Sequence, residues 1–83
     1  MTVCLVRLFA RARDLAGTER LSVNLEPGAT VADLREQLTA ARPALAELLP
    51  RCAFAISGEF ADDAQTVPAG ADIAVLPPVS GGT

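Results

Sequence analysis

The sequence contains no histidine, lysine, tryptophan or tyrosine, and all seven of its basic residues are arginine. Without histidine, the chain lacks the usual general base near neutral pH and the imidazole ligand that is common in metal sites. Ten acidic residues against seven arginines leave a net charge of −3. Nucleic-acid binding needs a basic patch, so this charge argues against it and favours a protein partner with a basic docking face. These absences point away from a self-contained enzyme, a metal site and a nucleic-acid-binding protein.

Cysteine is scarce, and long apolar runs are absent. Cys4 and Cys52 have neither metal-ligand spacing nor a CxxC motif, and each is predicted to be ordinary buried packing, because free cysteine behaves as a small hydrophobe. A disulfide between them is open arithmetically, but a reducing cytosol disfavours it. No apolar run approaches the ~20 residues of a membrane span, and no signal-peptide pattern opens the chain. We therefore expect a cytoplasmic protein with no membrane association.

Short runs of β-forming residues alternate with turn signals along the 83 residues, of which 51% are apolar. This length predicts one domain with a small core. Apolar–polar alternation and turn residues predict strands at 2–9, 19–25, 52–57 and 71–77. We expect the first two to pair antiparallel, with these side chains facing the core: Cys4, Val6, Leu8, Leu21, Val23 and Leu25.

The one long helix is predicted to begin at Thr30 and to end near Arg42. Thr30 is a good N-cap, and Asp33 puts a carboxylate in the first turn, where the helix dipole favours it. Pro43 ends the helix. Its apolar stripe is predicted to consist of Val31, Leu34, Leu38 and Ala41. Shorter helical turns are predicted at 10–17 and 43–50.

The order of the predicted elements, β-β-α-β-β, indicates an α+β fold with one main helix packed across a mixed sheet. After the last strand, Pro77 and Pro78 have no N–H groups for the ladder, and they hold the exit of the chain extended. Gly81 and Gly82 follow without side chains. We therefore predict a folded domain at 1–78 and a flexible C-terminal tail at 79–83 that carries the diglycine.

Four stretches carry a resemblance to a known family: LFARARDLAG near the start, GATVADLREQL at the helix, AISGEFADD at a hairpin, and VPAGADIAVLPPVSGG at the end. They cover nearly the whole chain, and the last stretch is the most specific, because the diglycine follows the right strand in the right fold order. The sequence resembles the MoaD/ThiS family of ubiquitin-like sulfur carriers. Within that family it is most similar to the small, sulfur-carrier subunit of molybdopterin synthase. The resemblance implies a ubiquitin-like β-grasp fold.

The resemblance also implies a chemistry for the tail, with Gly82 as the reactive residue and Gly81 beside it. In the family, an E1-like adenylyltransferase uses ATP and magnesium to adenylate the terminal glycine carboxylate. A sulfur donor protein then converts the adenylate to a thiocarboxylate. In molybdopterin synthase, the large subunit binds the cyclic pyranopterin phosphate precursor of the molybdenum cofactor, which receives this sulfur. The carrier itself is expected to bind no cofactor or metal.

A docking surface for these partners is implied by the same resemblance, formed by Phe9, Phe60, Leu76, Pro77, Pro78 and Val79. The residues themselves agree in part, since Phe9 and Leu76 fall on strand faces that are predicted to lie outside. The alternative is that the phenylalanines belong to the core, where this residue type is often found. Three arginines either rim the surface or are solvated charges: Arg7, Arg11 and Arg13. Asp62 and Asp63 are interpreted as turn and surface residues.

Thr83 departs from the family pattern, because the free carboxylate then belongs to a bulky, β-branched residue. A peptidase that removes Thr83 would expose Gly82. Otherwise the extra residue is tolerated or is an addition, or the protein has left sulfur transfer and serves as a ubiquitin-like interaction module. The chain could also be a carrier for thiamin or cysteine biosynthesis, although the PPVSGG and FARARDLAG stretches favour molybdopterin.

Overall fold

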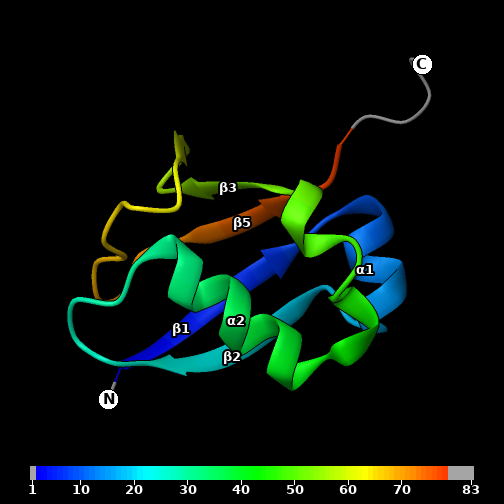
Figure 1. Cartoon of the computed structure of the whole chain (residues 1–83), viewed down its shortest axis with the longest axis horizontal. Helices are drawn as coiled ribbons and strands as arrows, with labels where there is room; N and C mark the ends of the chain where they lie inside the picture. Colours follow the sequence, from blue (N-terminus) through cyan, green and yellow to red (C-terminus); the bar gives the residue numbers. More distant parts are fainter. Residues whose placement is uncertain (1, 79–83) are drawn as a thin grey trace.

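The computed structural model describes residues 2–78 and consists of five strands and two α-helices in one layered unit (Figure 1). The elements are β1 (Thr2–Leu8), α1 (Ala10–Ala16), β2 (Arg20–Leu25), α2 (Val31–Ala41), β3 (Ala53–Ile56), β4 (Glu59–Ala61) and β5 (Ile73–Leu76). Short 3₁₀ turns at Pro43–Leu45 and Leu49–Arg51 lead from α2 to β3. The expected α+β architecture, a mixed sheet with the main helix across it, is confirmed.

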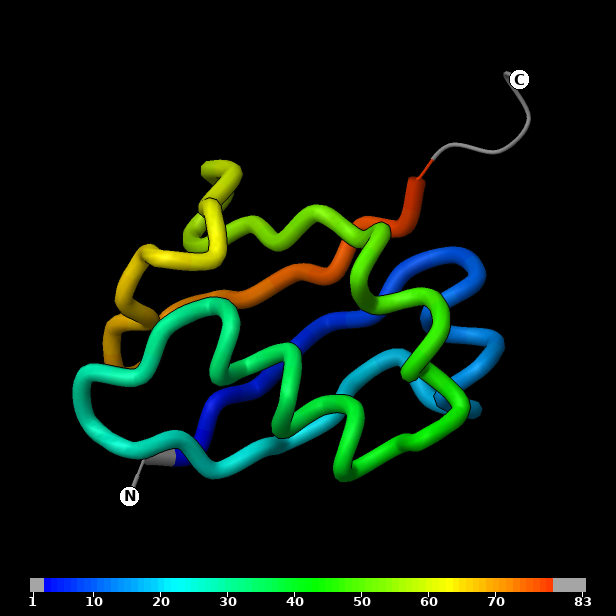
Figure 2. Tube along the Cα trace, in the orientation of Figure 1, coloured from blue at the N-terminus to red at the C-terminus, as the bar shows by residue number. Residues whose placement is uncertain are grey.

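The sheet has the strand order β2-β1-β5-β3-β4. β1 and β5 run parallel in its centre, and the other neighbouring pairs are antiparallel, including the predicted pair of β1 with β2. β1 and β5 therefore end at the same side of the molecule, beside α1 and far from the start of β1 (Figures 1 and 2). This topology brings the exit of β5 next to the chain that leaves β1.

The core lies between the sheet and α2, on the side that the alternation predicted. Cys4, Val6 and Leu8 of β1 are buried, whereas Val3 and Leu5, which alternate with them, are 62% and 47% exposed on the opposite face. β2 alternates in the same way over its whole length. α2 contributes the fully buried side chains Val31, Leu34 and Leu38. Apolar period-2 strands and a period-3.6 helix thus bury their stripes against each other.

α2 begins at a capping box, as Thr30 and Asp33 predicted. The Thr30 Oγ1 accepts a hydrogen bond from the Asp33 N–H at 3.4 Å, and the Asp33 Oδ2 accepts one from the Thr30 N–H at 2.9 Å. The N–H groups of the first two helical residues, Val31 and Ala32, donate to the Gln65 and Asp63 carbonyl oxygens. Backbone donors that helix starts usually leave free are therefore used to dock α2 on the 63–65 segment.

The predicted helix stripe is wrong at its last member, because Ala41 is exposed. The core below the final turn of α2 is filled by Leu45 of the following 3₁₀ turn, which is fully buried. The stretch 43–50 likewise forms 3₁₀ turns rather than one helical turn. The stretch 10–17 forms the expected helix, closed by Gly17 in the left-handed conformation.

The predicted order β-β-α-β-β also omitted one strand, β4. Its three residues are too few to show an alternating pattern, and it exists because of the turn before it. Ser57 and Gly58 both have positive φ, 52° and 86°, which is the two-residue type I′ geometry that matches the twist of a hairpin. The β3–β4 hairpin carries Phe60 at its edge strand.

The passage from β1 into α1 contains a strained residue. Phe9 is extended and caps α1, and Ala10 after it has a φ of 50°, a left-handed conformation that costs an alanine about 1–2 kcal/mol. The N–H groups of Ala12 and Arg13 both donate to the Phe9 carbonyl oxygen, at 3.1 and 3.4 Å. The chain therefore reverses sharply at Phe9 and leaves its ring at the rim of the sheet.

Candidate functional site

The face of the sheet opposite α2 carries the candidate site. Residues that pair directly across neighbouring strands share a face, so the register defines one row from β2 to β4: Arg20, Arg7, Ala74, Ala55 and Phe60. Ala74 and Ala55 are each only 8% exposed and form a low centre, whereas Phe60 stands out with 75% of its surface exposed. The position predicted for Phe60, on the surface rather than in the core, is confirmed.

Phe9 and Leu76 lie on the same face, one step closer to the exit of β5. Leu8 pairs with Val75 across the parallel strands β1 and β5. The next residues along the chain, Phe9 and Leu76, therefore lie opposite each other. Phe9 is 39% exposed and Leu76 is half-buried. Phe60 lies two strand spacings from β5, about 10 Å away. The side chains of Phe9, Leu76 and Phe60 therefore surround the two small, buried alanines at the centre of the face. We call this set, Phe9, Leu76, Ala74, Ala55 and Phe60, the apolar face.

Arg7 borders this face, because it pairs with Ala74 in the register and is followed on the β2 side by Arg20. Its Nη2 donates to the Asp72 Oδ2 at 2.8 Å, and its guanidinium carbon lies 5.6 Å from the centre of the Phe9 ring. Both partners of the ion pair are about half exposed, so the pair contributes little to folding. Arg11 and Arg13 are exposed on α1, as a rim would require.

Asp62 and Asp63 are both surface residues, as predicted, but they make different contacts. The Asp62 carbonyl oxygen accepts from the Gln65 N–H in a turn. Asp63 pairs with Arg35 of α2, whose Nη2 and Nε both donate to the Asp63 Oδ1, at 2.8 and 3.1 Å. Sequence reasoning gave Arg35 no role, because its partners lie 14 to 28 residues further along the chain.

The exit of the chain continues the apolar face through Pro77, which is half-buried, and Pro78, which is exposed. The other predicted site residues, Val79, Gly81, Gly82 and Thr83, lie outside the described residues. The same holds for the predicted tail at 79–83. The described part of the site is therefore the apolar face and the two prolines at the end of β5.

Both cysteines are buried and reduced in this structure, as predicted. Burial raises the pKa of the Cys4 thiol, and it raises the pKa of the Cys52 thiol despite the opposing effect of the nearby Arg35 guanidinium. The Cys52 thiol also donates to the Leu48 carbonyl oxygen at 3.3 Å. A neutral, buried thiol is a poor nucleophile, so these groups are packing residues.

We expect iodoacetamide at pH 8 to alkylate Cys4 and Cys52 at least about tenfold more slowly in the folded protein than in urea. The folded pKa values lie above the ordinary 9.0 of the unfolded chain, so the unfolded state loses these protons first. The free energy of unfolding should therefore fall as the pH rises past that value. Peptide mass spectrometry gives the two alkylation rates. Equal rates in the folded and the urea-unfolded protein would contradict the assignment of Cys4 and Cys52 as buried packing residues.

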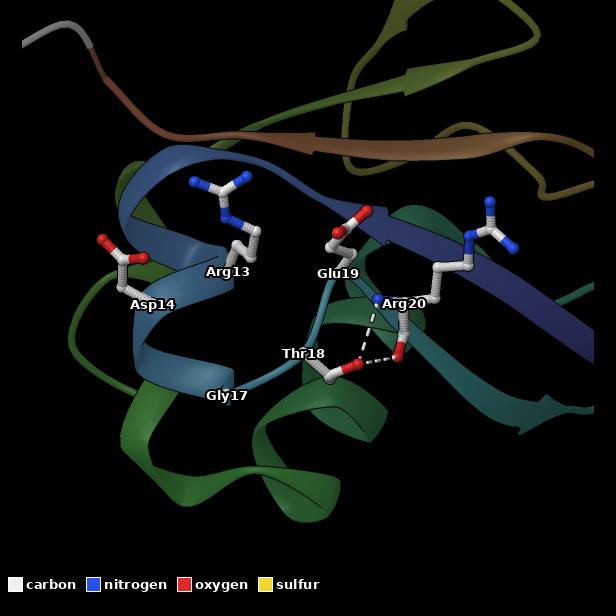
Figure 3. Close-up of a pocket in the computed structure, with 6 residues that line it drawn as sticks. All are labelled: Arg13, Asp14, Gly17, Thr18, Glu19 and Arg20. Carbon is white, nitrogen blue, oxygen red and sulfur yellow. Dashed lines mark hydrogen bonds between the residues drawn. The ribbon is translucent and has the colours of Figure 1, made fainter.

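A surface hollow beside the C-terminal end of α1 does not look like a reaction site (Figure 3). Its lining interleaves opposite charges, with Arg13 and Arg20 among Asp14 and Glu19. The Thr18 hydroxyl there already donates to the Arg20 carbonyl oxygen at 3.1 Å.

Within residues 2–78, no group of three acidic or cysteine side chains could hold a metal ion. No helix in that range is long and apolar enough to cross a membrane.

The mixed β2-β1-β5-β3-β4 sheet, crossed by α2 and open on its apolar face, defines a ubiquitin-like β-grasp protein. The ThiS family model matches residues 6–82, and the chain belongs to the ThiS family.

Relatives agree over almost the full length of the chain. The molybdopterin synthase sulfur carrier subunit of Chlamydomonas reinhardtii is 37% identical over 79 residues, which cover 93% of this chain and 95% of that protein. The crystal structure of small archaeal modifier protein 1 from Haloferax volcanii superposes with a TM-score of 0.87 at 28% identity, covering 95% of this chain and all of that one. A protein–protein complex of subunits 1 and 2 of the molybdopterin-converting factor from Helicobacter pylori 26695 contains a similar chain. That chain has a TM-score of 0.69 and 26% identity, with 98% of this chain and 100% of that one covered.

Proposed function

We propose that this protein is the sulfur-carrier small subunit of a molybdopterin synthase. The observation that carries the proposal is the apolar face at the exit of β5, on a chain that belongs to the ThiS family. The match to the Chlamydomonas sulfur carrier subunit over 93% of the chain supports molybdopterin synthesis as the pathway. Exposed large apolar side chains on one sheet face, here Phe9 and Phe60, are typical of a protein that docks on others.

The proposed chemistry takes place at the carboxylate of Gly82. An activating enzyme joins this carboxylate to AMP from magnesium–ATP and releases pyrophosphate, which turns a poor electrophile into a good one. A sulfur donor protein then supplies a persulfide, whose terminal sulfur attacks the carbonyl carbon and displaces AMP. A thiol reductant cleaves the resulting acyl disulfide, which releases the donor and leaves a thiocarboxylate. The large subunit directs that sulfur to the cyclic pyranopterin phosphate. Gly81 and Gly82 suit this route because a backbone without Cβ atoms can enter a narrow channel. Thr83 has to be removed, by a peptidase, before Gly82 can react.

The apolar face has a mechanical role in this proposal. Phe9, Phe60 and Leu76 dock on the activating enzyme and on the large subunit in turn, and Pro77 and Pro78 direct the chain from β5 into the partner's active site. The carrier supplies binding and position, while the partners supply the catalytic groups. This division fits the buried, neutral thiols of Cys4 and Cys52.

A second candidate function is attachment of the activated carboxylate to amines of other proteins. It is favoured by the close superposition on a small archaeal modifier protein. Sulfur delivery to thiamin or cysteine biosynthesis, and an interaction role without sulfur chemistry, would each require a different protein partner. A pull-down from native cells therefore separates these functions by the companion that is recovered.

Intact mass spectrometry of the protein from its own cells tests the proposal. We expect a species that lacks Thr83 and is heavier than the Gly82 carboxylate form by the difference between sulfur and oxygen. Adding the purified large subunit and the pyranopterin precursor should return that species to the carboxylate mass. A chain that keeps Thr83 and gains no sulfur after incubation with activating enzyme, ATP and donor would contradict sulfur transfer.

A further inference from the structure

Arg35 joins three segments that are far apart in the sequence. Its guanidinium donates to the Asp63 carboxylate and, through Nη1, to the carbonyl oxygens of Leu49 and Cys52, the latter at 3.1 Å. The guanidinium carbon also lies 4.6 Å from the centre of the buried Phe54 ring. The Arg35 side chain is only 20% exposed. One arginine head thus contacts the chain before β3, within β3 and after β4.

These contacts hold the base of the β3–β4 hairpin. Cys52 directly precedes β3, and Asp63 comes two residues after the end of β4. The turn at Ser57–Gly58 closes the opposite end of the hairpin. Arg35 therefore fixes both open ends to α2, and the Ala32 N–H bond to the Asp63 carbonyl oxygen strengthens the same attachment.

The position of Phe60 depends on this attachment of the hairpin to α2 more than the position of a buried residue would. Phe60 belongs to a three-residue edge strand that pairs only with β3. Phe60 is 75% exposed, so its own burial does little to keep β4 in place. Short edge strands fray readily when little else holds them. The position of Phe60 on the apolar face is then set by the hairpin turn at one end and by Arg35 and Asp63 at the other.

We propose that Arg35 and Asp63 are positioning residues for partner docking, which act by holding Phe60 in its binding position on the apolar face. This inference rests on the proposed function, in which Phe60 contacts the large subunit. Arg35 lies on α2, at the covered face of the sheet, so it acts on the partner through the hairpin and not by contact. Loss of the ion pair lets β4 fray, and binding must then include the cost of ordering Phe60 again.

The test is a double-mutant cycle with the purified large subunit, with affinity measured by calorimetry. Asp63→Ala removes the Arg35 ion pair, and Asp62→Ala is the matched control, since it removes a neighbouring carboxylate of the same charge. We expect Asp63→Ala to weaken binding about three- to tenfold and Asp62→Ala less than about twofold. In a Phe60→Ala background, Asp63→Ala should have an effect below about twofold, because its target is gone.

Amide hydrogen exchange provides the second measurement and does not need the partner. Asp63→Ala should speed exchange in β4 about three- to tenfold and leave β1 and β2 unchanged, which separates hairpin fraying from global destabilisation. An equal effect of Asp63→Ala on binding with and without Phe60 would overturn the positioning role, and so would unchanged binding by Asp63→Ala. If Phe60→Ala itself leaves binding unchanged, the proposed docking surface fails together with this inference.

Discussion

A chain that ends at Gly82 is expected to accept sulfur in full, whereas a chain shortened by both glycines is expected to accept none that can be detected. Two residues set the carboxylate back by up to about 7 Å of extended chain. A misplacement of about 1 Å at a reacting group already costs on the order of a hundredfold in rate. The chain that retains Thr83 should also fail, because its carboxylate overshoots and carries a β-branched side chain.

The measurement is intact mass after incubation with the activating enzyme, ATP and the sulfur donor, over a time course. Pyrophosphate release from the same mixtures shows whether the block comes before or after adenylation. The circular dichroism of all three chains serves as the control for folding. Equal sulfur loading of the chain without Gly81 and Gly82 would place the reactive group elsewhere and end the carrier proposal.

Phe54 and Phe60 provide the second prediction, because they are the same residue type on neighbouring strands with opposite surroundings. Phe54 is fully buried beneath Arg35, and Phe60 is the most exposed large apolar residue of the described chain. Phe54→Ala should lower the free energy of unfolding by about 3–5 kcal/mol. That is a large part of the roughly 5–15 kcal/mol that holds small domains together, so this variant should be partly unfolded at 37 °C.

Phe60→Ala should change the free energy of unfolding by less than about 0.5 kcal/mol, as exposed positions do. It should nevertheless weaken binding to the large subunit at least about tenfold, since a few aromatic anchors carry most of the binding energy of many interfaces. Urea unfolding and calorimetric titration of both variants measure the two effects. A Phe60→Ala protein that is destabilised as much as Phe54→Ala would show that the hairpin belongs to the core.

Most of the fold could be predicted from the sequence, because the signals that determine it act between residues close together in the chain. Alternation in β1 put Val3 outside and Val6 inside, because successive side chains of a strand point to opposite faces. Thr30 and Asp33 predicted the start of α2, since a capping box needs only residues three apart. Gly17 predicted the end of α1 for the same reason. Each of these signals is local, so each could be read along the chain.

The sequence predicted less of the candidate site. It predicted Phe9, Phe60 and Leu76 as docking residues through a family resemblance, and it indicated outward faces for Phe9 and Leu76. It did not predict that β5 would lie parallel to β1, and this pairing is what brings Leu76 level with Phe9. Nor did it predict that Arg7 would be paired with Asp72 at the edge of the apolar face.

The sequence by itself determined which residues are apolar, where helices and turns begin, and which side chains alternate across each strand. Only the tertiary structure decided the strand order, the bounds of β4, the burial of Leu45 where Ala41 was expected, and the role of Arg35. The physical reason is the range of the interactions. Capping and alternation act within a few residues, whereas Arg35 reaches Asp63 across 28 residues, and such a contact forms only once the chain has folded.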